Sequence, residues 1–306
     1  MSEQHIVLGA GPVGREVAQL LSDRGSQVVV VTRTGKPSEL PGVRAVGADA
    51  SDADRLSELT KGAAVLYNCA KPGNYTTWNE VWPPLASSLL TAAERTGATL
   101  AITGNLYPYG PVEGEMTEDL PDAATDSKGM LRAKMWADAL AGHRAGKIHA
   151  FEVRGSDYLG TGVGQNGHIS RVVPAALRGK TVRVLGRADQ PHSWTDVRDM
   201  ARTLVAVADR PDAWGRLWHA PTNAPRSQEQ AINGVMAAVG RPSVKVRSFP
   251  AIIKLANPFV PMMRELDALS YQRDSPCLLD STAVETEFNL EPTPWDEVCR
   301  RTGLAY

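Results

Sequence analysis

The chain has 306 residues and a formal net charge of −1 at pH 7, with 42% hydrophobic and 22% charged residues. This is ordinary globular composition, and the length is sufficient for a large hydrophobic core. The balanced charge argues against a nucleic-acid-binding protein and against an acidic disordered chain.

The cysteines and the longest apolar runs exclude further classes. The three cysteines and six histidines show no metal-ligand spacing, so we expect no metal site. An odd cysteine count without a signal peptide is typical of a reducing compartment, which predicts a cytoplasmic protein. No apolar run approaches the roughly 18 residues that a membrane span needs, so we expect no membrane partner.

The first 33 residues carry the clearest pattern. Residues 6–8 predict a strand, residues 28–31 predict a second strand, and apolar residues at helical spacing lie between them. The turn after the first strand has the spacing GxGxxG. A strand, a glycine turn and a helix in this order are typical of a dinucleotide-binding site.

Each glycine of this turn has a physical role. The first permits the tight turn, the second lets the backbone approach a pyrophosphate, and the third lets the helix pack closely on the strand. The helix N-terminus offers unpaired N–H groups and the positive end of its dipole to the phosphates. The cofactor-binding residues expected here are Gly9, Gly11, Pro12, Val13 and Gly14.

The end of the second predicted strand indicates which dinucleotide binds. An NAD site usually has Asp or Glu there, whereas an arginine suits the 2′-phosphate of NADP. This chain has Thr32 and Arg33, and no carboxylate before Glu39. We therefore predict NADP(H), held by Arg33 through bidentate or stacking contacts. The alternative is that Arg33 is a solvated loop residue.

Strand and helix patterns continue to alternate through the first half of the chain. The helix pattern at 79–96 is interrupted early by two prolines. Either Ser51 or Asp52 is expected to cap an earlier helix. This alternation predicts an α/β fold, a Rossmann-type doubly wound parallel sheet with ligands at the carboxyl ends of its strands. The further predicted strands are 43–46, 63–68, 98–103 and 148–153, and the further helices include 79–96 and 126–143. Cofactor-binding residues expected after these strands are Asp49, Cys69, Ala70, Lys71, Thr103 and Asp157.

The second half of the chain is less regular. Beyond about Gly160, glycine and proline become more frequent and the elements shorter. We expect a dinucleotide-binding domain over residues 1–160 and a smaller α/β substrate-binding portion over 161–306, partly interleaved with the sheet.

Four later segments are similar to those of one family. The chain resembles the extended short-chain dehydrogenase/reductase family, whose members include nucleotide-sugar epimerases and dehydratases. Its GxGxxG turn suits the atypical branches, because the family more often has GxxGxxG. The four segments are TGNLYPYG at 103–110, FEVRGSDYLGTGVG at 151–164, HSWTDVRDMARTL from His192, and LLDSTAVETEFNLEPTPWDE near the end.

The chain departs from this family in its chemistry. The family uses a Ser or Thr, a Tyr and a Lys, the last two in a YxxxK pattern that places both on one helix face. The Tyr transfers a proton, while the Lys lowers the pKa of that Tyr and holds the ribose. At these positions the present chain has Asn105, Lys128 and Arg132, and no tyrosine lies between Tyr109 and Tyr158.

Three interpretations of this replacement stay open. Lys128, beside Arg132, would act as an acid or as an electrostatic clamp on a carbonyl oxygen. Alternatively, Tyr107 supplies the hydroxyl group, aided by Asn105 as a hydrogen-bond donor. In the third interpretation the redox chemistry is lost and the protein binds NADP(H) without turnover.

The resemblance also places substrate residues, which are Tyr75, Trp78, Tyr158 and His192. Tyr75 and Trp78 are equally compatible with simple packing, and for His192 a pocket-lining or structural role is favoured over that of a general base. The predicted function is an NADP(H)-dependent oxidoreductase acting on a small carbonyl or alcohol. A nucleotide-sugar epimerase or dehydratase and an NADP(H)-sensing regulator are the alternatives. The resemblance further implies a homodimer through the helices after the fourth and fifth strands, although neither predicted helix has a clear extra apolar face.

Overall fold

The structure is a computed structural model that describes residues 3–38, 40–71, 73, 75–249 and 265–306. The chain divides into two compact units, which are described separately. The first consists of Met1–Pro108, Ser127–Arg154 and Met200–Trp218, and the second of Tyr109–Asp126, Gly155–Asp199 and His219–Tyr306. The chain therefore passes between the units several times.

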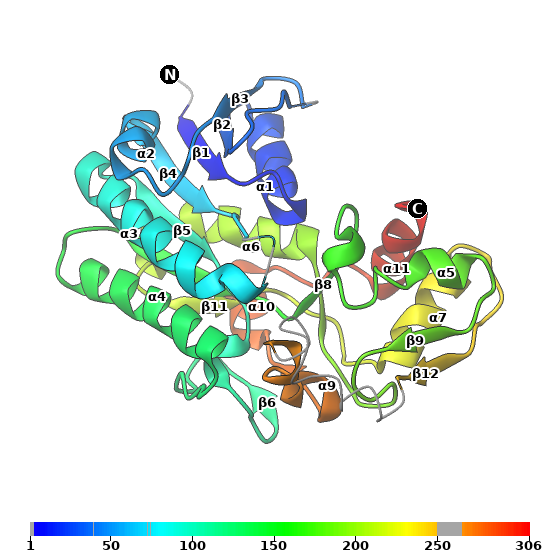
Figure 1. Ribbon diagram of the computed structural model, residues 1–306. Helices are drawn as coiled ribbons and strands as arrows, with labels where there is room; N and C mark the ends of the chain where they lie inside the picture. Colours follow the sequence, from blue (N-terminus) through cyan, green and yellow to red (C-terminus); the bar gives the residue numbers. More distant parts are fainter. Residues whose placement is uncertain (1–2, 39, 72, 74, 250–264) are drawn as a thin grey trace. The chain divides into compact units, whose positions relative to one another are not determined.

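A parallel sheet of seven strands organises the first unit (Figure 1). The strand order is β11-β7-β5-β4-β1-β2-β3, and it reverses between β1 and β4. Such a reversal is the point at which doubly wound sheets bind ligands. The predicted Rossmann-type α/β fold is confirmed. The strands are β1 Gln4–Leu8, β2 Gln27–Thr32, β3 Val43–Gly47, β4 Ala63–Asn68, β5 Thr99–Thr103, β7 Ala150–Arg154 and β11 Leu217–His219.

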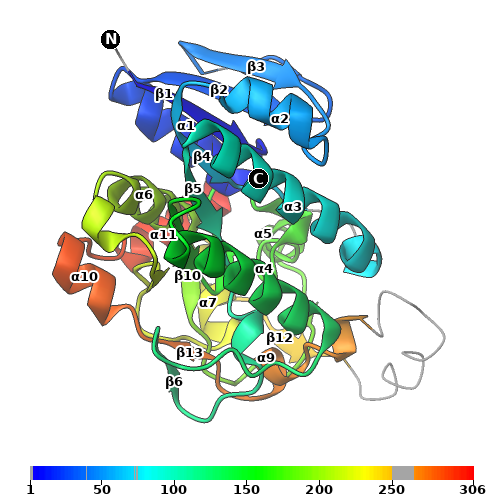
Figure 2. The same ribbon diagram turned by 90° about the vertical axis from the view of Figure 1, so that its left-hand side faces the viewer.

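Helices connect these strands, and α3 and α4 lie side by side (Figure 2). The helices are α1 Pro12–Asp23, α2 Ala53–Thr60, α3 Trp78–Thr96, α4 Ser127–Arg144 and α6 Val197–Ala208, with short 3₁₀ turns η1 Tyr75–Thr77, η2 Tyr107–Tyr109 and η4 Pro211–Ala213.

The expected interruption of α3 is wrong, because the helix runs through Pro83 and Pro84. Both prolines lie in its first two turns and are exposed, as are residues 79 and 80, whose carbonyls lose their helical donors. Carbonyl groups at exposed positions can accept hydrogen bonds from solvent instead, so the helix can continue.

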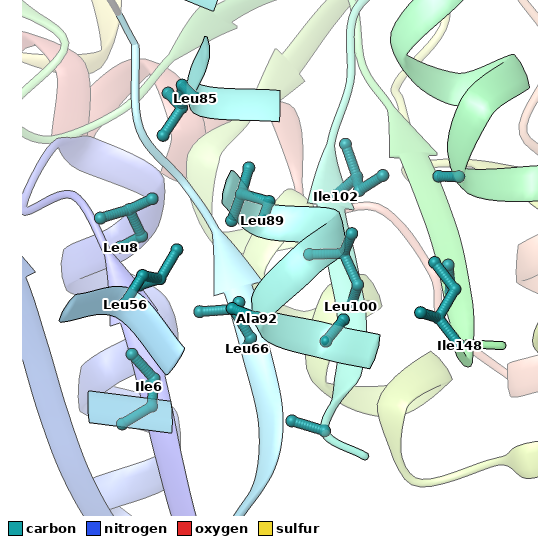
Figure 3. Close-up of a cluster of buried hydrophobic side chains, with 14 of the residues drawn as sticks. Ile6, Leu8, Leu56, Leu66, Leu85, Leu89, Ala92, Leu100, Ile102 and Ile148 are labelled. Atoms are coloured by element: carbon teal, nitrogen blue, oxygen red, sulfur yellow. The ribbon is translucent and has the colours of Figure 1, made fainter. Parts of the chain in front are cut away.

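The core of the first unit lies between the sheet and helices α2, α3 and α4 (Figure 3). Alternate strand residues face apolar stripes of these helices, and each fully buried aliphatic side chain contributes roughly 1.5–3 kcal/mol. The buried residues include Ile6, Leu8, Leu66, Leu100 and Ile102 from strands and Leu56, Leu85, Leu89 and Ala92 from helices.

The second unit is built from short parallel strand pairs and short helices. Its own core includes Leu159, Trp194, Ile232 and Val298, from β8, β10, α7 and α11. Its strands are β6 Glu115–Met116, β8 Asp157–Leu159, β9 Val182–Val184, β10 Trp194–Asp196, β12 Val246–Ser248 and β13 Leu278–Leu279. Its helices are α5 Val173–Leu177, α7 Gln228–Ala238, α9 Tyr271–Asp274, α10 Thr282–Phe288 and α11 Trp295–Leu304, with a 3₁₀ turn η3 Gly164–Asn166.

Within the described ranges, the helices are all too short or too polar to span a bilayer. The same residues contain no group of three or more His, Cys, Asp or Glu side chains arranged to hold a metal ion.

Candidate cofactor and active site

The turn between β1 and α1 requires glycine for two measurable reasons. Gly9 has a φ of 97°, and a Cβ on it would lie 2.8 Å from the carbonyl oxygen of Cys69. A Cβ on Gly14 would lie 2.1 Å from the carbonyl oxygen of Gly9. The turn, the helix and the end of β4 therefore approach one another more closely than any side chain allows.

The N-terminus of α1 is open to a ligand. Gly11 is the N-cap, no side chain caps the helix, Pro12 begins it, and the first turn contains no acidic residue. A Cβ on Gly11 would meet no atom within 4 Å. The space beside Gly11 is thus open at the positive end of the helix dipole, which fits the pyrophosphate of a dinucleotide.

Parallel pairing brings the ends of β1 to β5 to one edge of the sheet. At the end of β2, the Thr32 hydroxyl oxygen accepts a hydrogen bond from the N–H of Gly35 at 3.0 Å. Gly35 has a φ of 60° and packs against Gly47 at the end of β3. This tight turn leaves Arg33 exposed at the sheet edge, and Glu39 lies outside the described residues.

Asp49 follows β3 and is exposed. Its Oδ1 accepts hydrogen bonds from the backbone N–H of Ser51 at 2.9 Å and from the Ser51 hydroxyl at 2.8 Å. These bonds, and the positive charge of Arg33, lower the pKa of Asp49. A fixed carboxylate therefore stands near Arg33 at the sheet edge.

Cys69 and Thr103 meet at the ends of β4 and β5. The Thr103 hydroxyl donates to Cys69 Sγ at 3.6 Å. Burial raises the pKa of Cys69 to about 12, against the opposing effect of that hydrogen bond. Cys69 is therefore an inert thiol that shapes the sheet edge. Ala70 beyond it is half-buried, and Lys71 is exposed.

An aromatic cluster follows, formed by Tyr75, Trp78 and Tyr107 from η1, α3 and η2. The hydroxyls of Tyr75 and Tyr107 are 2.9 Å apart. Tyr75 stacks on Trp78, with ring centroids 4.8 Å apart and an interplanar angle of 12°. The ammonium groups of Lys71 and Lys128 lie 5.5 Å and 5.8 Å from the centroid of the Tyr75 ring. Two phenols and two cations thus share one cluster.

Asn105 positions Tyr107 through the backbone. The side-chain oxygen of Asn105 accepts a hydrogen bond from the N–H of Tyr107 at 3.2 Å. This local turn orients the 3₁₀ segment that carries the Tyr107 hydroxyl.

Arg132 is buried and holds the sheet together. One of its guanidinium nitrogens donates to the carbonyl oxygen of Thr103 at 2.7 Å, and the same nitrogen lies 3.6 Å from a carboxylate oxygen of Glu152. Its guanidinium also lies 4.8 Å from the ring centroid of Trp82. Glu152 pairs in turn with the fully buried Arg154 at 2.9 Å. Arg132 therefore links α4 to β5 and β7.

In the second unit, Asp157 and His192 form a network that sequence reasoning did not join. His192 Nε2 lies 3.2 Å from Asp157 Oδ2 and 3.3 Å from the Ser156 hydroxyl. His192 Nδ1 lies 3.2 Å from the carbonyl oxygen of Gln272. The carbonyl can only accept a hydrogen bond, so Nδ1 carries a proton and Nε2 faces the carboxylate.

The charges around Asp157 decide its protonation. Burial alone would raise the pKa of Asp157, but the hydrogen bond from His192 and the charges of His168, His192 and Arg273 outweigh burial and hold it well below its usual range. Burial lowers the pKa of His168 to about 4, although Asp157 opposes this. Tyr158 is half-buried on β8, opposite Thr195 of β10.

Comparison with known proteins decides the family. Residues 5–217 match the model of the NAD dependent epimerase/dehydratase family. The chain belongs to the NAD-dependent epimerase/dehydratase family. This confirms the resemblance inferred from the four segments.

Two curated relatives of this family member are informative. It is 27% identical over 242 residues to the human epimerase family protein SDR39U1, covering 76% of this chain and 79% of the relative. It is 28% identical over 148 residues to shikimate dehydrogenase (NADP(+)) of Haloarcula marismortui, covering 43% of this chain. The chain spans only 56% of the length of that dehydrogenase.

Solved structures share the fold of this epimerase/dehydratase family member. One is dTDP-glucose 4,6-dehydratase from Bacillus anthracis in complex with NAD, with a TM-score of 0.80, 16% identity, and coverage of 100% of this chain and 96% of that one. Another is UDP-glucuronic acid 4-epimerase from Bacillus cereus in complex with NAD, with a TM-score of 0.79, 15% identity, and coverage of 99% and 98%.

Lys128 and Arg132, the residues expected at the positions of the family's Tyr and Lys, lie on α4. Both side chains are buried, at 2% and 3% exposure, on the inward face of α4. Lys128 approaches Tyr75, whereas Arg132 holds the ends of β5 and β7. The structure brings Tyr75, Trp78, Tyr107 and Lys128 together within the first unit, and places Asp157, Tyr158 and His192 in the second.

Proposed function

We propose that this protein is an NADP(H)-dependent oxidoreductase that acts on a small carbonyl or alcohol, with the family's usual triad replaced. The observation that carries the proposal is the uncapped N-terminus of α1 at the same sheet edge as Arg33. A site that leaves the first helical turn to a ligand and presents a guanidinium at the end of β2 suits a dinucleotide with a 2′-phosphate.

The described residues fit such a cofactor. The N–H groups of Val13 and Gly14 would bind the pyrophosphate, Arg33 the 2′-phosphate, and Asp49 the adenine end of the molecule. When bound, the dinucleotide supplies or accepts a hydride at its nicotinamide. The relatives support both forms of the cofactor, since the similar shikimate dehydrogenase uses NADP(+) and the two solved structures contain NAD.

The proton would come from the aromatic cluster. Tyr107 carries a hydroxyl group fixed by Asn105 through the backbone and by Tyr75 through its side chain. Lys128 places a positive charge beside these phenols, where it would stabilise the oxyanion of a reacting carbonyl. Arg132 contributes by holding Thr103 and β5 in place.

Arg33→Ala tests the cofactor preference. Loss of the guanidinium should raise the Kd of NADPH roughly tenfold or more and leave that of NADH almost unchanged, because only NADPH carries the 2′-phosphate. Fluorescence titration of both nucleotides measures this. Arg44→Ala removes an exposed arginine from the beginning of β3 and is the matched control. Equal weakening of both nucleotides by Arg33→Ala would refute the preference.

Turnover tests the reaction itself. NADPH oxidation should exceed the blank with some member of a panel of aldehydes and ketones, and Tyr107→Phe should lower kcat by on the order of 10²-fold. Nucleotide binding without turnover on any substrate would instead favour a regulatory NADP(H)-binding protein.

Membership of the epimerase/dehydratase family favours a second candidate, interconversion of a nucleotide sugar. Solved structures with the same fold include a 4-epimerase and a 4,6-dehydratase that act on nucleotide sugars. Lys128 at the tyrosine position counts against it, because transient oxidation of an alcohol needs a good base. Proton NMR of UDP- and dTDP-sugars incubated with the protein and NAD would detect a new sugar if this candidate is correct.

A further inference from the structure

We infer that Tyr75 and Tyr107 form a two-phenol proton relay in which Tyr75, whose ring is approached by the ammonium groups of Lys71 and Lys128, is the phenol that ionises. The inference rests on the proposed function, because it names the source of the proton in that reaction. It assigns the proton-transfer role to a tyrosine of η1, outside the helix on which the family has its YxxxK pair.

Geometry fixes the relay. The hydroxyl oxygens of Tyr75 and Tyr107 are 2.9 Å apart, a distance for direct proton transfer along one hydrogen bond. Trp78 is only 3% exposed and lies against both rings, stacked on Tyr75 and 6.1 Å from Tyr107 between centroids. The two phenols are therefore held by one rigid buried ring.

Charge distinguishes the two phenols. A phenolate spreads negative charge over its oxygen and ring, so a cation above the ring stabilises it more than it stabilises the neutral phenol. The ammonium groups of Lys71 and Lys128 both lie over the ring of Tyr75, at 5.5 Å and 5.8 Å. Lys71 comes from the segment after β4 and Lys128 from α4, so two elements favour ionisation of the same side chain.

The relay can supply the proton that the reduction of a carbonyl needs. A reduced nicotinamide, when bound, would supply the hydride for the new C–H bond, and the π electrons of the carbonyl would move to its oxygen. That oxygen takes the proton of Tyr107, whose oxygen takes the proton of Tyr75. Tyr75, which is half-buried, is left as a phenolate beside the two ammonium groups and regains a proton from water.

Tyrosinate absorbance measures the inferred property without cofactor or substrate. In the full-length protein, we expect one tyrosine to ionise at least one pH unit below the ordinary tyrosine pKa of about 10. Tyr75→Phe should abolish this transition, and Lys128→Met should move it to higher pH. Burial raises the pKa values of Tyr67, Tyr271 and Tyr306, so these side chains do not contribute in this range.

Tyr306→Phe is the control: it removes a tyrosine at the C-terminus, and the early tyrosine ionisation should remain. Absence of any early transition in the wild type would overturn the relay, as would its persistence in Tyr75→Phe. A thermal melt shows whether Tyr75→Phe is folded, and the Lys128→Met titration gives a separate answer if it is not.

Kinetics then separate the relay from the proposed function. With turnover, Tyr75→Phe should lower kcat by on the order of tenfold with little change in KM, and shift the pH profile of kcat, which a purely structural role would not do. An early tyrosine transition without any turnover would refute the proposed reaction but support the phenol pair. Turnover without an early tyrosine transition would support the proposed reaction and refute the phenol pair.

Discussion

Lys128 and Arg132 are buried cations one helical turn apart on α4, and their different chemistry explains their different surroundings. The planar guanidinium of Arg132 contacts a carbonyl, a carboxylate and an indole ring at once. Lys128 is a compact point charge and lies by an aromatic ring. A lysine at position 132 would not make the same set of contacts.

Glu152 shows how this unit tolerates buried charge. It is 1% exposed and lies between two buried guanidinium groups, those of Arg132 and Arg154. A Cβ on Gly104 would lie 2.7 Å from its carboxylate, so glycine leaves the space that the carboxylate needs. Paired and hydrogen-bonded charges of this kind are the ones that proteins bury.

Because of the buried His168, we expect the free energy of unfolding to fall in mild acid. Burial lowers the pKa of His168 to about 4, so the unfolded chain, with a histidine pKa of about 6.5, takes up this proton first as the pH falls. Stability due to this group is therefore present above about pH 6.5 and is lost between pH 6.5 and 4. Between pH 7 and pH 5, the free energy of unfolding should fall by about 2 kcal/mol because of this group.

Urea unfolding at the two pH values measures this difference. His168→Gln should remove most of it, whereas His149→Gln, at an exposed histidine, should keep it. A loss of equal size in His168→Gln and the wild type would show that His168 is not the responsible group.

Helix N-termini in this chain are satisfied in two ways. Asp52 caps α2, accepting hydrogen bonds from the N–H groups of residues 54 and 55, and Ser227 caps α7 in a reciprocal capping box with Gln230. At α1 no side chain caps the helix. Helices α3 and α11 also have no side-chain cap, but α1 is the uncapped helix that follows the glycine turn, where a phosphate would take the place of a cap.

Asp52→Ala should destabilise the protein by about 1 kcal/mol, because two N–H groups at the start of α2 lose their acceptor. Chemical denaturation measures the change. Ser51→Ala is the matched control, since the Ser51 hydroxyl bonds to Asp49 rather than to the helix, and it should cost clearly less. A larger loss for Ser51→Ala would mean that the cap is assigned to the wrong residue.

At the scale of the whole molecule, both compact units are assembled from separated stretches of chain. Residues 200–218 belong to the first unit, where Gly215 donates to the carbonyl of Ala150 at 2.7 Å and Trp218 is fully buried. The seventh strand of the sheet, β11, thus comes from a part of the chain beyond the predicted domain boundary.

A fragment of residues 1–160 should therefore not fold cooperatively on its own. It lacks β11 and the buried side chains of α6, including Met200 and Leu204, so β7 becomes an unpaired edge over an open core. Thermal denaturation followed by circular dichroism should show a sharp transition for the full chain and none for the fragment. A fragment melting as sharply as the full chain would contradict this.

Most of the first unit could be predicted because its signals are local. The strand patterns at 6–8, 28–31 and 63–68 and the glycine turn after the first of them depend on neighbouring residues alone. Local propensity also predicted an interruption of α3 at its two prolines, which is wrong. Propensity does not show that the carbonyls affected by these prolines lie at exposed positions. It also left two candidates for the cap of α2, where only the structure shows Asp52 as the acceptor.

The sequence by itself determined the Rossmann-type fold, the family and the glycine turn, because periodicity and glycine spacing act over a few residues. Tertiary structure alone decided which side chains meet. Tyr75, Tyr107 and Lys128 are far apart in sequence, and only the parallel order of β4, β5 and the following helices brings them together. The glycine turn therefore indicates the ligand, whereas packing decides which groups stand ready to move a proton.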